Sequence, residues 1–593
     1  MMNNLKRFNY IEKLIAWLLD KTNEKQFLIF ASVMVGLSSG LAAIVLKAFI
    51  NFIRVYLVEG FFFEFDFKYT YLLLPLIGIG ITIIITVYFF KGNLNRGASN
   101  ILFAIAKKSS FLPFYQMYSH VITTALTVGF GGSSGIESPI VSTGAAIGSN
   151  FARTYQLSYK DRTMLLAAGA AGGIAGAFNA PIAGVLFALE VILVDISLSA
   201  FIPLLIAAAS GALLSKIILN EDGLLYFSLK QPFNYKNVPF YVLLGLLCGF
   251  ISLYYVSFFE KIENRFKAVK SNIAKWLIGG IALALLLAFF PSLYGEGYSS
   301  IKSLSENNIG DLFKNSLLFQ HVTQPWILFL LVVAVMLLKV LATGITLGSG
   351  GNGGNFAPSL FVGAYLGFAF AQLLSLIGIQ LPGSNFTIVA MAGILSGVFH
   401  APLTGIFLIA EITGGYELII PLMLVSSISY VIVTYFSPDS LDIKKLKARG
   451  AVISEDKDKS TLRKINVRAM IETDFASIHF NANLRRMIEI VKQSKRNTFP
   501  VLNNHKKLLG IIQLDHIKEE MFNPDLYDKM VAKEIMRKPG VVIDVKEDIF
   551  MIMQKFDESG QWNLPVVDGD TYIGFLSKSS ILDKYRHHLL QGV

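Results

Sequence analysis

Two segments of this chain repeat one unusual design, in which a glycine-rich bend leads into an apolar helix. The first, residues 135–139, reads Gly-Ile-Glu-Ser-Pro, and the second, residues 354–358, reads Gly-Asn-Phe-Ala-Pro. The start of a helix leaves backbone N–H groups unpaired and directs the positive end of the helix dipole outward, which favours a bound anion. The sequence therefore predicts an anion site built from two matched helix starts.

The composition places most of the chain in a membrane. Hydrophobic residues make up 53% of the chain and charged residues only 16%, whereas a soluble domain carries about 25% charged residues. About 20 apolar residues suffice to cross the hydrocarbon core as a helix. Runs of this kind include Phe27–Ile50, Tyr71–Phe90, Val238–Phe258, Trp276–Phe290 with its flanks, Trp326–Leu347 and Leu418–Tyr435.

Shorter apolar segments, interrupted by glycine and proline, lie between these runs. They are Leu102–Ala106, Met164–Ala177, Ile182–Val194, Phe386–Val398 and Leu403–Ile412. Half-length helices at membrane depth are tolerated where they line a cavity enclosed by protein. A receptor or an anchored enzyme would contain fewer of them, so the pattern favours a transporter or a channel.

A second pair of matching segments extends the duplication. Residues 176–184, followed by Glu190, match residues 397–405, followed by Glu411, in nearly the same register as the glycine motifs. This register predicts two homologous membrane halves, at about 27–218 and 238–437. Broken helices at matching places in two halves indicate a substrate site near the membrane midplane. An alternative is that the glycines, among them Gly144, Gly148, Gly363 and Gly367, merely allow close helix packing.

The charge distribution predicts that both termini are cytoplasmic. Residues 1–26 are basic and are expected to form a cytoplasmic leader, not a removed signal peptide. Lysines and an arginine at 444–449 follow the last apolar run, as the positive-inside bias requires. The net charge of +11 is accounted for by anionic lipid headgroups and needs no nucleic acid. The predicted location is a cell membrane, plasma or inner, crossed several times.

The composition changes abruptly after Pro438. A linker is expected at 438–464, followed by two copies of one α/β unit at 465–524 and 530–593. Each copy has a helix with apolar periodicity, a short strand ending in Pro-Val and a strand led by glycine. This part of the chain is predicted to form a soluble pair of domains.

Together these motifs resemble the chloride-channel (CLC) family of chloride channels and chloride/proton exchangers. Residues 354–358 look like its G-x-F-x-P motif and residues 135–139 like its G-x-E-x-P motif, while the C-terminal pair resembles tandem CBS domains. The resemblance implies an all-α polytopic membrane protein with two inverted-repeat halves, followed by a cytoplasmic α/β CBS pair. It also implies a homodimer that is not an enzyme and whose substrate is chloride, with protons as a second substrate in exchangers.

The resemblance implies an anion site made of backbone amides and one hydroxyl. The amides of Asn355 and Phe356 are expected to form the central site, because helix N-termini bind a halide without trapping it. A second cradle is expected from the amides of residues 136–138, that is, Ile136, Glu137 and Ser138. A third segment, residues 98–102, matches the family's G-S-G-I-P pattern weakly, and there Ser99 would donate its hydroxyl. The alternative for Ser99 is an ordinary helix N-cap.

Glu137 is the expected gate. Its carboxylate can occupy the anion cradle as a tethered anion and can swing aside when protonated, which would couple conduction to pH or to proton movement. The alternative is a helix-start glutamate stabilised by the dipole on a soluble loop. Two further acids in apolar helices, Glu190 and Glu411, are expected to be structural and to bond backbone amides.

Two positions depart from the family pattern. Val191 stands where exchangers generally carry a second, proton-relaying glutamate, so the sequence favours a channel over an exchanger. Asp442 stands where a pore tyrosine is usual. Since an acid would repel the anion, either Asp442 is expected to point away from the pathway or the alignment slips locally.

Alternatives to a chloride channel are a chloride/proton antiporter, fluoride export and, from a different class, an intramembrane serine protease. The protease would use Ser133 or Ser134 with His400, and it needs a nucleophile within hydrogen-bond reach of its base. No cofactor is expected for transport. An adenine nucleotide at the CBS pair is a further alternative, although Gln513, Asp515 and His516 in the first copy and Ser577 and Ser580 in the second match the usual pattern poorly.

Overall fold

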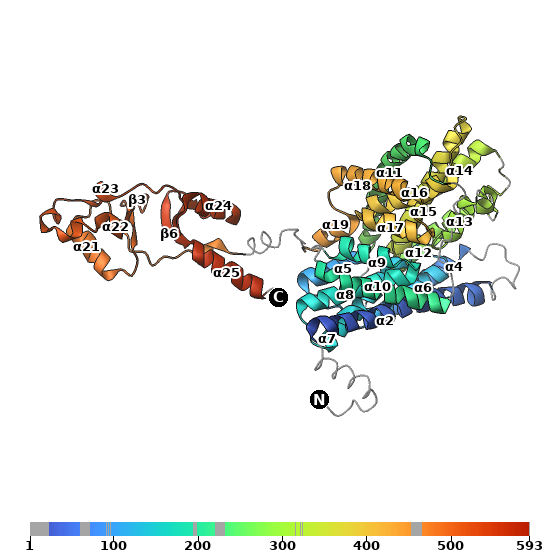
Figure 1. Cartoon of the computed structure of the whole chain (residues 1–593), viewed down its shortest axis with the longest axis horizontal. Helices are drawn as coiled ribbons and strands as arrows, with labels where there is room; N and C mark the ends of the chain where they lie inside the picture. Colours follow the sequence, from blue (N-terminus) through green and yellow to red (C-terminus); the bar gives the residue numbers. More distant parts are fainter. Residues whose placement is uncertain are drawn as a thin grey trace, which may run out of the picture. The chain divides into compact units, whose positions relative to one another are not determined.

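The computed structural model describes residues 23–59, 72–90, 92, 94, 97–193, 198–219, 232–306, 308–314, 316–320, 322, 324–451 and 465–591. Most of the leader expected at 1–26 and the second part of the linker expected at 438–464, residues 452–464, therefore lie outside the described residues. The chain divides into two compact units, residues 1–453 and residues 454–593, and each is described by itself (Figure 1).

The first unit is built from helices, and its two halves follow each other along the chain. The first half contains α2 (Glu24–Phe52), η1 (Ile53–Glu59), α4 (Leu74–Tyr88), α5 (Ala98–Lys107), α6 (Gln116–Gly129), α7 (Glu137–Thr154), α8 (Tyr159–Phe178), α9 (Pro181–Phe187), η3 (Ala188–Ile192) and α10 (Leu198–Leu219). The second contains η4 (Tyr235–Asn237), α11 (Val238–Ala268), α12 (Asn272–Phe289), η5 (Pro291–Leu293), α13 (Tyr298–Ser305), η6 (Ile309–Phe313), α14 (Pro325–Gly348), α15 (Phe356–Leu376), α16 (Gly383–Phe399), α17 (Pro402–Ile412) and α18 (Ile419–Phe436).

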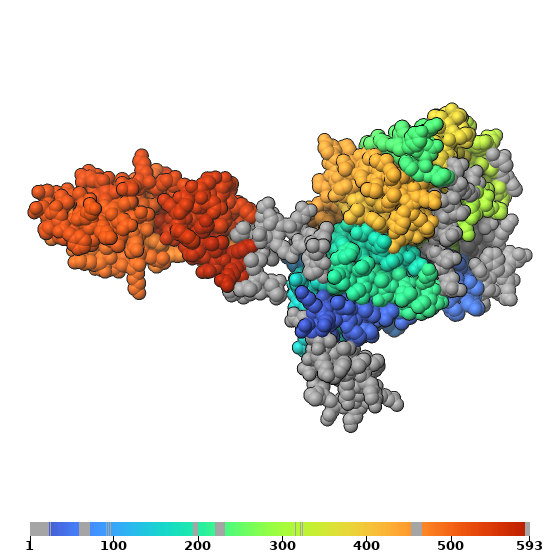
Figure 2. All heavy atoms as spheres, viewed as in Figure 1, coloured from blue at the N-terminus to red at the C-terminus, as the bar shows by residue number. Residues whose placement is uncertain are grey.

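The helices have the lengths that a multi-span membrane protein requires. Among the described residues, 7 helices are long and apolar enough to cross a membrane, and α5, α16 and α17 belong to a set of shorter apolar helices. The prediction of full and broken membrane helices is thus confirmed. Helix α2 lies on the surface of this unit (Figure 2, blue), where Leu41, Val45 and Phe52 are exposed. Apolar side chains on this outer face suit contact with lipid.

The two halves pack their central helices in the same way. A Cβ atom added at Gly144 or Gly148 of α7 would meet the backbone of α8, and one added at Gly363 or Gly367 of α15 would meet the backbone of α16. Small residues let helix backbones approach closely in membranes. These four glycines therefore serve helix packing, in equivalent places of the two halves.

The interval expected to be a linker begins with a helix of the first unit, α19 (Leu441–Ala448). Its Leu441 and Leu446 are buried, and the helix packs against α5 and α16. The expected linker was therefore wrong in its first part, because Leu446 joins Leu102 in a small apolar cluster. A short helix that is mostly polar, such as α19, can therefore still bury its few leucines.

The second unit consists of two three-stranded sheets with the same topology. In the first, β1 (Ile478–His479) pairs parallel with β2 (Thr498–Leu502), which pairs antiparallel with β3 (Leu508–Gln513). In the second, β4 (Ile543–Asp544), β5 (Asn563–Asp568) and β6 (Thr571–Ser577) repeat this order. The helices are η7 (Val467–Met470), α21 (Leu484–Gln493), α22 (Leu514–Ile517), η8 (Glu520–Phe522), η9 (Pro524–Leu526), α23 (Ala532–Ile535), α24 (Ile549–Ser559) and α25 (Lys578–Gln591). The predicted duplication is visible in this shared topology.

Candidate functional site

The two glycine-rich bends meet at one point inside the first unit. Gly135 and Gly354 form an antiparallel bridge in which each N–H donates to the other's carbonyl, at 2.9 and 2.8 Å. Because buried backbone groups must be paired, this exchange fixes the two bends to each other. The helices that follow, α7 and α15, therefore begin side by side, one from each half.

Glu137, the first residue of α7, lies across this junction. Its side chain is only 1% exposed. Oε1 accepts a hydrogen bond from the Tyr298 hydroxyl at 2.6 Å, and Oε2 accepts one from the Ala357 N–H at 3.3 Å. The carboxylate therefore occupies the N-terminal turn of α15, the helix of the other half. A Cβ atom at Gly135 would collide with Oε2, so this residue has to be glycine for the carboxylate to lie there.

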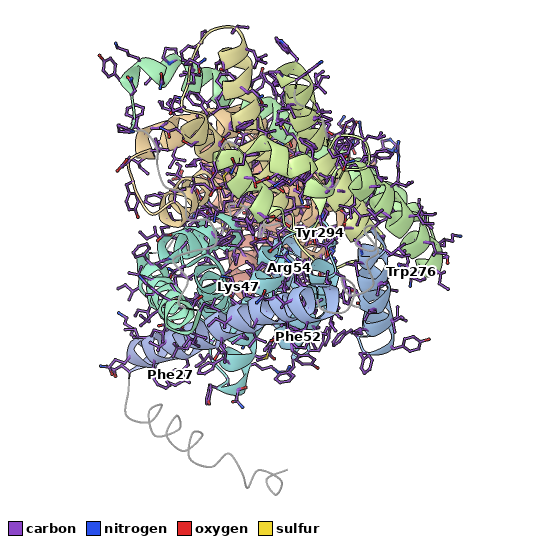
Figure 3. The ribbon with its side chains drawn as sticks, turned by 90° about the vertical axis from the view of Figure 1, so that its right-hand side faces the viewer. Phe27, Lys47, Phe52, Arg54, Trp276 and Tyr294 are labelled. Carbon is purple, nitrogen blue, oxygen red and sulfur yellow. The ribbon has the colours of Figure 1, made fainter. Side chains whose placement is uncertain are left out.

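The loop at residues 294–297, held by contacts on both of its sides, brings Tyr298 to Glu137. The Tyr294 ring occupies the space beside Gly131 that a Cβ atom would need, and the Gly295 N–H donates to the Gly131 carbonyl at 3.1 Å. From the other side, the fully buried Lys339 donates to the Gly295 carbonyl at 2.9 Å. A Cβ atom added at Gly295 would lie 3.7 Å from the Arg54 guanidinium, and Figure 3 labels both Arg54 and Tyr294.

Lys339 also lies over the ring of Phe361, with 4.7 Å between Nζ and the ring centroid. The same ring stands where a Cβ atom at Gly297 would be, and Gly297 has a φ of +92°. A buried ammonium group is costly unless it is well paired. The carbonyl and aromatic contacts of Lys339 meet that need and hold the loop that positions Tyr298.

A small cavity of about 10 Å³ lies at the helix starts. Its lining comes from α5, α7, α8, α9, α15, α16 and α19, in the form of Ala98, Glu137, Ser138, Val141, Ile174, Phe187, Phe356, Phe399 and Asp442. A single water needs a volume of about 10–15 Å³. The cavity thus has room for about one water-sized body beside the two carboxylates that line it.

The apolar part of the lining is both aliphatic and aromatic, and its aromatic side chains belong to a cluster around Phe356. The Phe356 ring lies 5.8 Å from Phe178, 6.3 Å from Phe187 and 5.4 Å from Phe399, centroid to centroid. These rings come from four helices, and Phe356 is 2% exposed. The cavity therefore combines helix N-termini with apolar faces, and among the described residues its lining includes neither lysine nor arginine.

The sequence-predicted site residues only partly line this cavity. Glu137, Ser138 and Phe356 do, whereas Ile136 and Asn355 are buried residues that precede α7 and α15 and lie outside the lining. The Asn355 carbonyl accepts from the Tyr255 hydroxyl at 3.3 Å. Ser99 is 3% exposed and lies at the start of α5, next to Ala98 of the lining. Its role as a hydroxyl donor to an anion stays a prediction.

Asp442 does not point away from the cavity, and the expectation that it would was wrong. It lines the cavity, and its Oδ1 accepts a hydrogen bond from the Ser99 N–H at 3.1 Å. The physical reason is that the free N–H groups of the first turn of α5 attract a carboxylate as they would attract an anion. Repulsion between an acid and the transported ion does not prevent this contact with the α5 start.

Glu190 and Glu411 each cap a helix of the opposite half. Glu190 accepts from the N–H groups of Leu403 and Thr404, at 2.9 and 2.8 Å, and from the Thr404 hydroxyl. Glu411 accepts from the N–H groups of Ile182 and Ala183, at 3.0 and 2.9 Å. Helix starts favour negative charge, so both contacts are favourable. They agree with the structural role expected for these two acids.

The protease alternative fails on geometry. The buried hydroxyls of Ser133 and Ser134 have no hydrogen-bond partner among the described residues. His400 ends α16 and packs its ring against Tyr430. A serine nucleophile needs a base within hydrogen-bond reach, and neither serine has one.

The residues considered for a nucleotide in the second unit are engaged in local contacts. His516 accepts from the Gln513 N–H at 3.2 Å, Ser577 bonds Ser579 at 2.7 Å, and Ser580 donates to Glu472 at 3.1 Å. An adenine nucleotide at this pair stays an alternative from the sequence.

A larger cavity, of about 200 Å³, lies between α5 and the start of α6, where Lys108 and Gln116 are part of its lining. It includes neither of the paired glycine bends. Its size therefore does not make it the candidate site.

Sequence reasoning missed Tyr298 and Ala357. Tyr298 follows a glycine at the start of α13 and shares no motif with Glu137. Ala357 belongs to the motif at 354–358. The amides expected to act there were those of the two residues before it, Asn355 and Phe356. A model of the two motifs lying face to face would have indicated Ala357; nothing in the sequence indicated Tyr298.

Comparison with protein-family models gives two matches. Residues 78–434, more than half of the chain, match a model described as "Voltage gated chloride channel". Residues 532–587 match a model of the CBS domain. The second match covers the second copy of the C-terminal α/β unit, and the first copy shares its sheet topology.

Curated relatives carry two kinds of name. A putative chloride channel protein of Ralstonia nicotianae is 29% identical over 58% of this chain and 78% of its own length. An H(+)/Cl(-) exchange transporter of Vibrio vulnificus (strain YJ016) is 32% identical over 50% of this chain and 62%, less than two thirds, of its own length. A voltage-gated chloride channel of Escherichia coli O81 is 29% identical over 54% of this chain and 73% of its own length.

Solved structures share the fold at low sequence identity. A slow cyanobacterial Cl-/H+ antiporter superposes with a TM-score of 0.62 at 20% identity, covering 72% of this chain and 98% of its own. A eukaryotic CLC transporter superposes with a TM-score of 0.56 at 17% identity, and the match covers 96% of this chain and 98% of that transporter's chain. These similarities establish the fold of the membrane unit.

Proposed function

This chain belongs to the voltage-gated chloride channel (CLC) family of multi-pass membrane anion transport proteins, and we propose that it moves chloride through the cavity at the starts of α7 and α15, with Glu137 as the gate. The observation that carries the proposal is the position of the Glu137 carboxylate, which accepts the Ala357 N–H at the first turn of α15. That turn is where a chloride ion would find unpaired amides.

The cavity suits transport because it can bind an anion weakly. Its positive potential comes from helix N-termini and N–H dipoles, while its side-chain lining is aromatic, aliphatic or acidic. A lysine or arginine in this place would hold chloride too tightly for rapid release. Partial charges on several amides bind strongly enough for entry and weakly enough for exit.

Glu137 closes the cavity by competing with chloride for the same amides. Two hydrogen bonds, from Tyr298 and Ala357, hold its ionised carboxylate in place. Protonation removes the charge that the helix dipole attracts and weakens both contacts. The side chain then leaves the turn of α15, and chloride takes its place.

We favour a channel over a chloride/proton antiporter. Val191 lies in η3 and cannot relay a proton from the inner side. The antiporter is the second candidate, and it is favoured by the exchanger name of the Vibrio relative and by the acid at position 137. We also propose that chloride is preferred to fluoride, that the protein is a homodimer in a plasma or inner membrane, and that both termini are cytoplasmic.

Chloride efflux from proteoliposomes tests this function. Wild-type protein should release chloride, and Glu137→Gln should release it faster at neutral pH with a much weaker dependence on pH. Glu417→Gln, which removes an exposed carboxylate of the same unit, is the matched control and should behave as wild type. Absence of chloride release by the wild-type protein would contradict chloride transport, and unchanged pH dependence in Glu137→Gln would contradict the gate.

A further inference from the structure

Asp442 is a second carboxylate in the cavity, on a helix outside the two repeated halves. It lies in the first turn of α19, the helix that follows the last long apolar helix α18. Glu137 and Asp442 both line the same small cavity. The presence of two acids in an anion pathway demands an explanation, because like charges repel the ion and each other.

The two carboxylates are held in the same manner. Glu137 accepts the N–H of Ala357 in the first turn of α15, and Asp442 accepts the N–H of Ser99 in the first turn of α5. Each acid thus occupies a helix N-terminus that belongs to another segment. In both cases the oxygen atom lies where an anion bound to that turn would lie.

The first turn of α5 has no capping side chain at its N-cap residue, so its N–H groups can bind an anionic group from elsewhere. Its N-cap residue is Gly97, with a φ of +75° and no side-chain capping bond. A Cβ atom added there would meet Oδ1 of Asp442 at 3.7 Å, so the carboxylate lies directly against the bend. The N–H of Ser99 is therefore satisfied by a residue far along the chain and not by a local cap.

Lys445 attracts the Asp442 carboxylate in addition to the start of α5. Lys445, one turn further along α19, pairs with Glu263 at 2.9 Å, and Lys444 approaches Glu260 at 3.9 Å. Lys445 is thus shared with Glu263, and the hydrogen bond that Asp442 accepts comes from the start of α5. A chloride ion that takes this amide removes the hydrogen bond that holds the carboxylate at the start of α5.

From these contacts we infer that Asp442 is a second tethered anion, which occupies a chloride-binding position at the start of α5 and controls the α19 end of the cavity. This inference rests on the proposed chloride transport and adds a specificity-determining residue to it. Chloride passing from the Glu137 end must displace Asp442 from the Ser99 amide. When the Asp442 carboxylate leaves the Ser99 amide, the α19 end of the cavity opens. When the carboxylate binds this amide again, it displaces the chloride ion.

Chloride binding to purified full-length protein, measured by calorimetry, tests the inference. The parent is Glu137→Gln, in which the first carboxylate no longer carries charge. Adding Asp442→Asn should tighten chloride binding on the order of tenfold, since one like charge that lines the cavity is removed. Asp442→Ser, which is neutral and shorter, should give the same direction and serves if the asparagine variant does not fold.

The matched control is Asp439→Asn. Asp439 is an acid of the same segment, but it pairs with Lys447 at 2.6 Å and does not line the cavity. Its removal should leave chloride affinity within twofold of the parent.

Unchanged or weaker chloride affinity in Asp442→Asn, together with a lower unfolding temperature, would overturn the inference and leave Asp442 as a cap for α5. Chloride efflux from proteoliposomes separates this result from a failure of the proposed function. If wild-type protein moves no chloride, the transport proposal fails. If it moves chloride and the Asp442 variants bind it no better than the parent, only the second-anion inference fails.

Discussion

The Tyr298 hydroxyl donates a hydrogen bond of 2.6 Å to Oε1 of Glu137, inside a unit whose two glycine bends meet directly beside it. The tyrosine comes from α13 of the second half and the glutamate from α7 of the first. A charge-assisted bond of this length, made away from water, is among the stronger neutral-donor contacts in proteins. It identifies the hydroxyl as the side-chain group that holds the proposed gate closed.

Replacement of Tyr298 by phenylalanine should loosen the gate. The variant removes one of the two hydrogen bonds of the carboxylate and keeps the ring, so we expect chloride efflux at neutral pH to rise severalfold toward the Glu137→Gln rate. Efflux from proteoliposomes at fixed pH measures the change. Tyr435→Phe, at an exposed position, is the control and should be silent. Wild-type efflux in Tyr298→Phe would show that the hydroxyl has no part in closure.

The bridge between the two bends should tolerate no side chain at Gly354. An added Cβ atom would collide with Ser138 Oγ and approach its backbone nitrogen, so Gly354→Ala must separate the starts of α7 and α15. We expect this variant to lose most chloride efflux and to unfold at a lower temperature. Gly415→Ala, where a Cβ atom meets nothing, should match wild type in both measurements. Full activity of Gly354→Ala would show that the paired helix starts are not needed.

The crossed caps of Glu190 and Glu411 should contribute comparable stability. Replacement of either by alanine leaves N–H groups at a helix start without their acceptor, which costs about 1–3 kcal/mol for each buried group that loses its partner. Thermal unfolding of the purified protein in detergent should therefore show a lower Tm for both variants, with Glu190→Ala the lower because Thr404 also loses its hydroxyl contact. Glu417→Ala is the control. A Tm equal to wild type in both variants would contradict the capping role.

The sequence predicted the architecture because its duplication is explicit. The glycine and proline motifs at 135–139 and 354–358 indicated two halves with broken helices, and the apolar runs indicated the spans. Neighbouring helix starts joined by the Gly135–Gly354 bridge are the outcome of that symmetry. The expected linker failed at α19, because four lysine and arginine residues concealed the buried Leu441 and Leu446.

The site was less accessible to sequence reasoning. Tyr298 is brought to Glu137 by a loop held by Lys339 and Gly131, contacts that no local pattern encodes. Asp442 was expected to avoid the pathway on the ground of charge repulsion. The α5 start and Lys445 both attract this carboxylate, and its contact with α5 depends on the packing of α19 against α5. Motifs identified the helix starts, while tertiary contacts determine which groups occupy them.

Chloride flux with simultaneous proton recording, on wild-type protein beside Glu137→Ala, tests the central claim most directly. The account predicts wild-type flux that rises as pH falls, without net proton movement driven by a chloride gradient, and a variant with high flux at every pH. Proton movement coupled to chloride in the wild type would favour the antiporter. A Glu137→Ala protein that keeps the wild-type pH dependence would contradict the account.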